Sequence, residues 1–354
     1  MRLSRLRFLK LAGAAALAAA FATAAGNAVS AAAGDAPAPA AYMANRPFAA
    51  VDYSGRAMLV DASGKITWSC RLRDPNDLTL LPNGNILTTK GDGAREIRPA
   101  DNAVVFDYTA PVTPTPRNPK ARSEVFAVQR LANGDTFVGE CSSGRLLIVA
   151  PDGRTVRHEV RLLAKQTTPE RPLPGGHGFM RCARALDNGN FLISRFGAGA
   201  VEEYDRAGKL VWSAKVPGGA HTVVRAANGH TFVSAADFDI RAAGADGKPS
   251  GKKFKNPAFY EFDRAGNVVW KITNDDLPGR PLRFAAGFFL LPNGNVLLCN
   301  WVGHGHHGKA PHMLEITRDK KVVWQFDDHK QFRTVSSVHP FGDDGKPLPP
   351  AGVH

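Results

Sequence analysis

The chain has 354 residues, enough for one large β or α/β domain or for two smaller ones, and its 44% hydrophobic content excludes disorder over most of its length. Its 35 glycines and 25 prolines argue against a helical bundle, and four cysteines without a Cys-x-x-Cys pair exclude a disulfide scaffold, a zinc ribbon and thioredoxin chemistry. The formal net charge of +13 favours anionic partners.

The N-terminal segment has the pattern of a secretory signal. Basic residues from Arg2 to Lys10 precede an apolar, alanine-rich run that ends in small residues, so residues 1–25 are predicted to be a signal peptide. A membrane anchor is the alternative, but the run is short for a bilayer span. The Ala/Pro/Gly-rich residues 26–45 are expected to form a disordered leader. The sequence therefore predicts a periplasmic or secreted protein without a stable membrane anchor.

Two short phrases alternate along the rest of the chain. The Asn-Gly phrase (LLPNGNIL at residues 80–87) recurs at residues 130–138, 185–193, 225–233 and 290–298. The second phrase (DRAGKLVW at residues 205–212) has copies that end at Trp68, Trp270 and Trp324. Asn-Gly between apolar runs predicts a hairpin with a type I′ turn, in which both turn residues have positive φ. Asp-x-x-Gly before Val-Val-Trp predicts a second hairpin.

Two successive hairpins make a four-stranded antiparallel blade, so the fold class is all-β and the repeat predicts a six-bladed β-propeller. Asp344-Gly345 takes the sixth turn position. Residues 46–70 align without a gap on residues 190–214 and lack a first strand, which residues 334–341 are expected to supply. Both chain ends would then close the last blade. We expect one domain over residues 46–345, followed by a C-terminal tail at 346–354.

The same pattern predicts which face binds a ligand. The two kinds of tight turn share one face, so the longer connections lie on the opposite face, around a central funnel. These connections are residues 110–122, 163–178, 237–256, 274–281 and 301–311. Long loops on a rigid scaffold are where binding sites usually occur.

Polar residues recur at the expected rim of this funnel. The positions seven residues before each turn Asn or Asp are Asn76, Phe126, Arg181, His221, Ala286 and Ser337. Second strands end near Arg195 and at Asn300–Trp301. This mixture favours a polar pocket mouth over a structural rim, although such residues can also pair between blades.

His221 is the leading candidate catalytic residue, because a Gly-Gly pair places it at the start of an inner strand and imidazole can act as acid, base or nucleophile near neutral pH. His177, which follows a similar Gly-Gly, is the second candidate. A structural histidine held by loop carbonyls is the alternative for either one.

The candidate ligand-binding residues are cations, amides and one tryptophan. Guanidinium groups suit a carboxylate or sulfate, and the indole can stack on a sugar or an aromatic ring. These residues are Asn76, Arg181, Arg195, Arg283, Asn300 and Trp301. They predict a small-molecule or saccharide ligand that carries negative charge. No DNA- or RNA-binding motif occurs, so nucleic acid is not the expected partner.

One histidine-rich segment (NWVGHGHHGKAPH) could hold a divalent metal through His304, His306 and His307. Its glycine-rich backbone and its lack of an acidic ligand weigh against a metal. Cys141 and Cys182 lie on neighbouring blades and could pair after export, or remain buried free thiols.

Both repeat phrases resemble the pyrroloquinoline-quinone-like propeller repeats, across about residues 46–345, and look closest to secreted bacterial propellers related to arylsulfotransferases. The resemblance implies that His221 is a sulfate-accepting nucleophile, with Arg181 and Asn300 as oxyanion partners. The chain departs from typical arylsulfotransferases in lacking a large N-terminal β domain. It also lacks the vicinal cysteine pair and calcium site of quinoprotein dehydrogenases, which argues against bound quinone.

Two functions remain open at this point. The first is a lyase, hydrolase or sulfotransferase that uses His221 on an extracellular anionic or sugar substrate. The second is a non-catalytic propeller whose rim binds a glycan or a protein.

Overall fold

The computed structural model describes residues 41–53, 55–115, 118–163, 176–236 and 256–350, with short strand segments at 238–239 and 253–254. The expected signal peptide, residues 26–40 of the expected leader and the last four residues of the tail lie outside the described residues.

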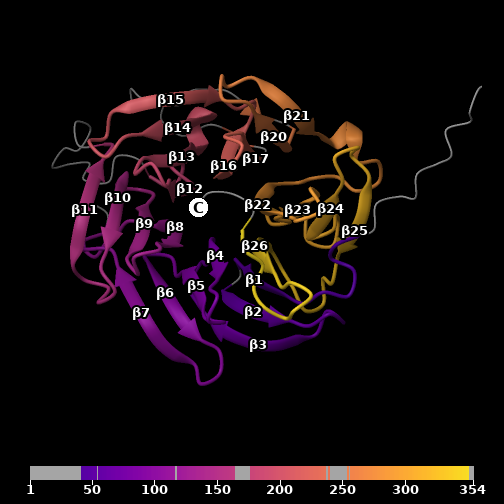
Figure 1. The fold of residues 1–354 in the computed structure, drawn as a ribbon, viewed down its shortest axis with the longest axis horizontal. Helices are drawn as coiled ribbons and strands as arrows, with labels where there is room; N and C mark the ends of the chain where they lie inside the picture. Colours follow the sequence, from indigo (N-terminus) through magenta and orange to yellow (C-terminus); the bar gives the residue numbers. More distant parts are fainter. Residues whose placement is uncertain are drawn as a thin grey trace, which may run out of the picture. The chain divides into compact units, whose positions relative to one another are not determined.

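Six four-stranded antiparallel sheets surround a central axis, as the repeat predicts (Figure 1). Along the chain the first five blades are β4 (Leu78–Leu80), β5 (Ile86–Thr89), β6 (Gly93–Arg98) and β7 (Ala103–Thr109); β8 (Val125–Arg130), β9 (Thr136–Glu140), β10 (Arg145–Val149) and β11 (Val156–Arg161); β12 (Cys182–Ala185), β13 (Phe191–Arg195), β14 (Ala200–Tyr204) and β15 (Leu210–Lys215); β16 (Gly219–Arg225), β17 (Thr231–Ala236), β20 (Ala258–Phe262) and β21 (Val268–Ile272); and β22 (Ala285–Leu290), β23 (Val296–Asn300), β24 (Met313–Ile316) and β25 (Val322–Phe326). A short pair, β18 (Phe238–Asp239) and β19 (Lys253–Phe254), lies in the connection between β17 and β20.

The sixth blade is closed by both ends of the chain. Its order is β26 (Val335–Pro340), β1 (Phe48–Asp52), β2 (Arg56–Val60) and β3 (Ile66–Arg71). β26 pairs antiparallel with β1, with Phe48 opposite Pro340 and Val51 opposite Ser337. The inner strand of this blade therefore comes from the C-terminal part of the chain, as expected from the sequence.

The Asn-Gly turns have a different geometry from the type I′ turn that we expected. Only their glycines have positive φ, for example 82° at Gly84 and 88° at Gly134, and the asparagines do not. Each Asn side chain instead accepts the backbone N–H two residues later, as in the 3.0 Å bond from Asn85 N to Asn83 Oδ1. The same bond forms at Asn133, Asn188, Asn228 and Asn293. The asparagine recurs because its side chain is an acceptor, and only the glycine must adopt a left-handed conformation.

Repeated tryptophans join several blades to the next one. Trp212 Nε1 donates to the carbonyl oxygen of Arg264 at 3.0 Å, and Trp270 Nε1 donates to that of Arg318 at 3.0 Å. Both acceptors lie in the outer turn of the following blade. His158 takes this place in the second blade, with Nε2 at 3.1 Å from the carbonyl oxygen of Arg206 in the third blade. The second phrase therefore encodes inter-blade contacts as well as a hairpin.

The packed chain extends beyond residues 46–345 at both ends. The N–H groups of Tyr42 and Met43 each donate to the buried carboxylate of Glu315 at 2.7 Å, and the Met43 side chain is buried in the core. At the other end, Leu348 is buried, and its carbonyl oxygen lies 2.8 Å from His339 Nε2. Residues 41–45 and 346–350 are thus part of the folded body.

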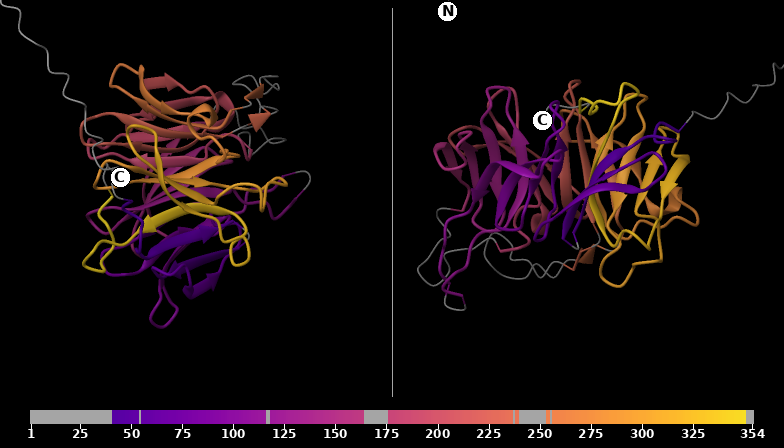
Figure 2. Two further views of the ribbon diagram at one scale, coloured as in Figure 1. Left: turned by 90° about the vertical axis from the view of Figure 1, so that its right-hand side faces the viewer. Right: turned by 90° about the horizontal axis from the view of Figure 1, so that it is seen from below.

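The described parts of the connection at residues 110–122 and of the tail lie on opposite faces. Figure 2 shows the connection at residues 110–122 extending from one face, while the tail approaches the other face, close to the Asn-Gly turn at Leu81 and Pro82. Only short 3-10 helices, η2 (Phe196–Ala198) and η3 (Asn274–Asp276), occur in the described part of the chain, and no helix there is long and apolar enough to cross a membrane.

Candidate functional site

A cavity of about 220 Å³ lies on the propeller axis at the funnel end. Four rim positions from the repeat alignment line it: Asn76 and Arg181 just before β4 and β12, and His221 and Ala286 on β16 and β22. Its lining residues are Tyr53, Asn76, His177, Arg181, Phe196, His221, Phe284, Ala286, Trp301, His304 and Ser336. The structure therefore brings together four of the predicted ligand-binding or catalytic groups nearest the axis, with Trp301 beside them.

Arg181 supplies a buried cation to this cavity. Its guanidinium carbon lies 4.8 Å from the centroid of Phe126 and 4.9 Å from that of Phe196, so aromatic rings flank the guanidinium group. The residue is 8% exposed, and it forms no ion pair with a carboxylate among the described residues. Burial lowers the pKa of this guanidinium. A buried, unpaired cation is unfavourable without an anionic partner, and this is the strongest physical sign of a ligand site.

A chain of contacts holds His177 against Arg181. His177 Nδ1 lies 2.9 Å from Glu124 Oε1, and its Nε2 lies 2.5 Å from Arg181 Nη2. Because the guanidinium can only donate, Nε2 accepts and Nδ1 carries the proton that bonds to Glu124. Burial opposes ionisation of Glu124, but the His177 hydrogen bond and the charge of Arg181 outweigh it, and the pKa of this carboxyl is lowered. His177 therefore orients the cation and leaves no free ring nitrogen.

His221 has a different environment from His177. It is 3% exposed, and its Nδ1 lies 3.1 Å from the hydroxyl of Thr222. Burial, together with the nearby charges of Arg181 and His177, places its pKa well below the usual value of 6.5. The imidazole is therefore neutral at physiological pH. When Nδ1 donates to Thr222, Nε2 keeps a lone pair that can accept a proton from a bound molecule.

Aromatic rings form the remaining wall of the cavity. Trp301 packs edge-on against Tyr53 at 5.9 Å, against Phe284 at 5.2 Å and against His304 at 4.8 Å between ring centroids. Phe284 also contacts His221 at 5.3 Å. Trp301 thus lines the cavity, as predicted, within a group of aromatic side chains.

Asn300 does not line the cavity, contrary to our expectation. Its Oδ1 accepts the N–H groups of Arg283 and Phe284, and its Nδ2 donates to the carbonyl oxygens of Pro281 and Pro311. The residue is fully buried. Its amide is saturated by backbone groups that it fixes in place, so it cannot act as an oxyanion partner.

Arg195 and Arg283 also lie outside the lining of the cavity. Arg195 pairs with Glu202 at 2.9 Å and stacks on Phe179 at 4.2 Å, so its charge is already neutralised within its own blade. Arg283 lies in the segment that leads into β22, and its backbone N–H is held by Asn300. Their predicted role in binding a ligand at the funnel is therefore not supported by their positions.

The histidine-rich segment does not assemble a metal site from His304, His306 and His307. His304 lines the funnel, whereas His307 Nε2 lies 3.2 Å from the carbonyl oxygen of Phe332. No group of three His, Cys, Asp or Glu side chains among the described residues is arranged to hold a metal ion. The glycines at 303, 305 and 308 let these imidazoles diverge. All four cysteines are free thiols, so the pairing considered for Cys141 and Cys182 does not occur.

Sequence reasoning missed several lining residues. Tyr53 and Phe196 each follow a predicted second strand by one position, and Phe284 precedes an inner strand, so an inspection of neighbouring rim positions could have found them. Ser336 lines the cavity in place of Ser337, its neighbour on β26. Glu124 has no sequence signal, because its partner His177 belongs to a different connection.

Comparisons with known proteins support the fold and leave the function open. No family model and no curated protein matches the chain. A solved structure of a protein of unknown function from Bacteroides caccae superposes with a TM-score of 0.67 at 24% identity, covering 84% of this chain and 98% of that one. A streptogramin B lyase structure gives 0.50 at 13% identity, covering 85% and 89%, and a catalytically inactive variant of virginiamycin B lyase from Staphylococcus aureus with quinupristin gives 0.51 at 13%, covering 86% and 94%. The chain is thus similar in fold to β-propellers that include lyases.

Proposed function

We propose that this protein is an exported β-propeller that binds a small anionic molecule, including an acidic saccharide, in its funnel cavity. Arg181 would hold the negative group, His177 would orient Arg181, and the rings around Trp301 would contact the rest of the ligand. The observation that carries the proposal is the buried Arg181 guanidinium, which lies between two phenylalanines with no carboxylate paired to it among the described residues.

We further propose that His221 acts on the bound molecule as a proton acceptor. A neutral imidazole beside an anion-binding cation suits a lyase or hydrolase, because the cation stabilises negative charge that develops as a proton is removed. A sulfotransferase, in which His221 is the nucleophile, follows from the resemblance of the repeats to arylsulfotransferase-type propellers. That reaction would have to proceed without Asn300, whose amide is fully engaged.

The alternative is a non-catalytic propeller that binds a glycan or protein. The observation that favours it is the low pKa of His221, which makes the imidazole a weak base. A binder would use the same cavity and the same cation.

The test is calorimetric titration with sulfate, phosphate, glucuronate and glucose, the last two being a charged and a neutral sugar of similar shape. We expect at least one anion to bind, glucose to bind at least tenfold more weakly than glucuronate, and Arg181→Met to weaken anion binding tenfold or more, which corresponds to about 1.4 kcal/mol. Arg283→Met is the matched control, because this arginine lies outside the cavity lining. Equal affinity in Arg181→Met, or no binding by any of the anions, would contradict the proposal.

A further inference from the structure

We propose that the central channel holds a second binding site, at the end nearest the Asn-Gly turns, which takes a neutral and largely apolar small molecule. This site is distinct from the funnel cavity, because the two share no lining residue.

The second cavity has a volume of about 650 Å³, roughly three times that of the funnel cavity. Inner strands of the blades, two Asn-Gly turns and the tail form its wall, and most of the lining side chains taken together are apolar. The main apolar contributors are Leu78, Leu80, Val128, Val224, Phe288 and Phe289. A ligand that fills this space would bury mostly hydrocarbon surface.

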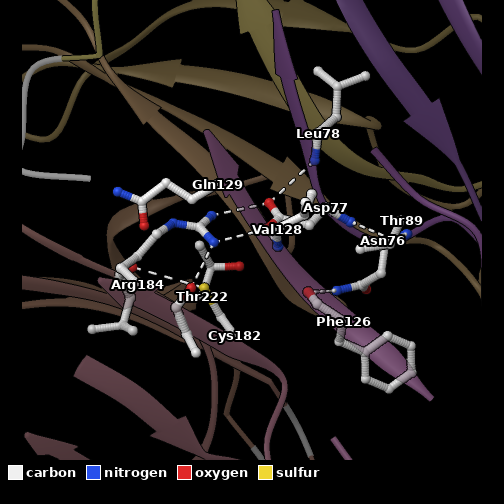
Figure 3. Close-up of polar contacts among 12 residues, drawn as sticks. Asn76, Asp77, Leu78, Thr89, Phe126, Val128, Gln129, Cys182, Arg184 and Thr222 are labelled. Carbon is white, nitrogen blue, oxygen red and sulfur yellow. Dashed lines mark hydrogen bonds and ion pairs between the residues drawn. The ribbon is translucent and has the colours of Figure 1, made fainter. Parts of the chain in front are cut away.

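A buried ion pair lies in the wall of the second cavity. Arg184 Nη1 lies 2.7 Å from Asp77 Oδ2, and Arg184 Nη2 lies 3.0 Å from Asp77 Oδ1 (Figure 3). Asp77 also accepts the N–H groups of Leu78 at 3.1 Å and Val128 at 3.0 Å. Both charges are therefore satisfied by the protein. In the funnel, by contrast, the charge of Arg181 has no carboxylate partner among the described residues. The second cavity therefore presents no unpaired charge that would attract a charged ligand.

The other charged and amide side chains named here are also occupied, whereas three hydroxyl groups line the cavity: those of Thr79, Thr222 and Ser337. Arg130 pairs with Glu96, and the Gln129 amide makes both of its hydrogen bonds to Ala185. The Thr222 hydroxyl accepts from His221 Nδ1 in the tautomer described above, so its proton remains available. The cavity therefore suits an apolar molecule with few hydrogen-bonding groups, such as a carbonyl or an ether oxygen.

The tail also lines this cavity. Pro347, Leu348, Pro349 and Pro350 line it, and the segment is anchored by the bond between His339 Nε2 and the carbonyl oxygen of Leu348 and by the bond from Leu348 N to the carbonyl oxygen of Pro340, at 3.1 Å. Prolines at this position add apolar surface and no N–H donor. This part of the wall is thus apolar as well.

The experiment uses a matched pair of fluorescent probes on the full mature chain: phenylnaphthylamine, which is neutral, and its sulfonated analogue, which is anionic. Ser337→Trp should fill the cavity, because Ser337 lines it with a small side chain, and Ser337→Ala is the control at the same position. We expect the neutral probe to bind the parent, Ser337→Ala and Arg181→Met with equal affinity, and to bind Ser337→Trp at least tenfold more weakly. The melting temperature of each variant reports folding, and Thr79→Trp replaces Ser337→Trp if the latter fails to fold.

Three results would overturn the proposal. The first is no binding of the neutral probe to the parent. The second is unchanged binding in a folded Trp variant. The third is an anionic probe that binds the parent equally well and is displaced by the same Trp substitution, which would contradict the neutral class of ligand. None of these outcomes bears on Arg181, so the funnel proposal is tested separately.

Discussion

Asn300 and His221 are both rim residues in the repeat alignment, but their side chains have opposite surroundings. Asn300 makes four hydrogen bonds to backbone groups and faces no cavity, whereas His221 makes one bond through Nδ1 and lines the funnel. The first pattern is that of a structural residue, and the second is that of a functional one.

Alanine substitutions should separate these two roles. Asn300→Ala strands buried backbone groups and should lower the free energy of unfolding by on the order of 3 kcal/mol. His221→Ala should leave urea unfolding nearly unchanged and should weaken ligand binding by about 1–3 kcal/mol or, in an enzyme, lower turnover by about 10²-fold. A large loss of stability in His221→Ala, with binding retained, would assign His221 to the core instead.

His339 should make stability depend on pH. Burial lowers the pKa of His339 to about 4, against 6.5 for a free histidine, and outweighs the hydrogen bond from Nε2 to the carbonyl oxygen of Leu348, which raises the pKa. Its Nδ1 accepts the N–H of Leu80. The unfolded chain therefore binds a proton that the folded chain excludes, and stability should fall as the pH drops from about 6.5 to about 4. The loss from this group is on the order of 3 kcal/mol. Urea titrations of the parent and of His339→Gln at pH 7 and pH 4.5 measure it, and an equal loss in both proteins would contradict the assignment.

Part of the site could be predicted because the repeats can be aligned residue by residue, so that equivalent positions in different blades are known. Counting back from each Asn-Gly turn identifies Arg181 and His221 without any knowledge of the chemistry. The same count includes no information on burial or on contacts between connections. The ends of the second strands, aligned in the same way, gave Asn300 an expected ligand role for the same reason, and nothing in the sequence indicated Glu124.

At the scale of the elements, the hairpin turns show that the fold can be predicted correctly even when the predicted turn type is wrong. Asn-Gly marks a hairpin in either geometry, so the strand order was predicted correctly. The φ values could not be predicted, because they depend on whether the Asn side chain or its backbone satisfies the turn. The repeated Trp was likewise read as part of a strand, while its bond to the next blade needed the structure.

The side-chain bond in the turn can be tested at Asn293, which is exposed and accepts from Asn295 N at 3.1 Å. Asn293→Ala removes this acceptor and should lower the free energy of unfolding by about 1 kcal/mol. Asn293→Asp keeps a side-chain acceptor and serves as the control. Equal losses in the two variants, measured by urea unfolding, would show that the acceptor has no role.

At the scale of the whole molecule, the ring depends on both chain ends. β26 covers the inner edge of β1, and the N–H groups of Tyr42 and Met43 complete the contacts of Glu315. Glu96 and Glu261, on the corresponding strands of other blades, instead meet the arginine of the following blade. At Glu315, the N–H groups of the N-terminal segment thus take the place that an arginine of the following blade has at Glu96 and Glu261.

Removal of β26 should open the ring. A chain that ends after Asp328 would expose the edge of β1, and we expect aggregation or loss of cooperative melting. A chain that ends after Pro350 keeps β26 and the tail contacts, and should melt like the parent. Cooperative melting of the shorter chain at the parent's temperature would contradict the closure.

The most direct test of the central claim is a crystal structure of the protein soaked with glucuronate or, if titration shows it to bind more tightly, with sulfate. The account predicts one bound anion in the funnel cavity, with an oxygen within hydrogen-bond distance of the Arg181 guanidinium and the molecule in contact with His221 and Trp301. An anion bound elsewhere on the propeller, with the funnel cavity holding only water, would contradict it.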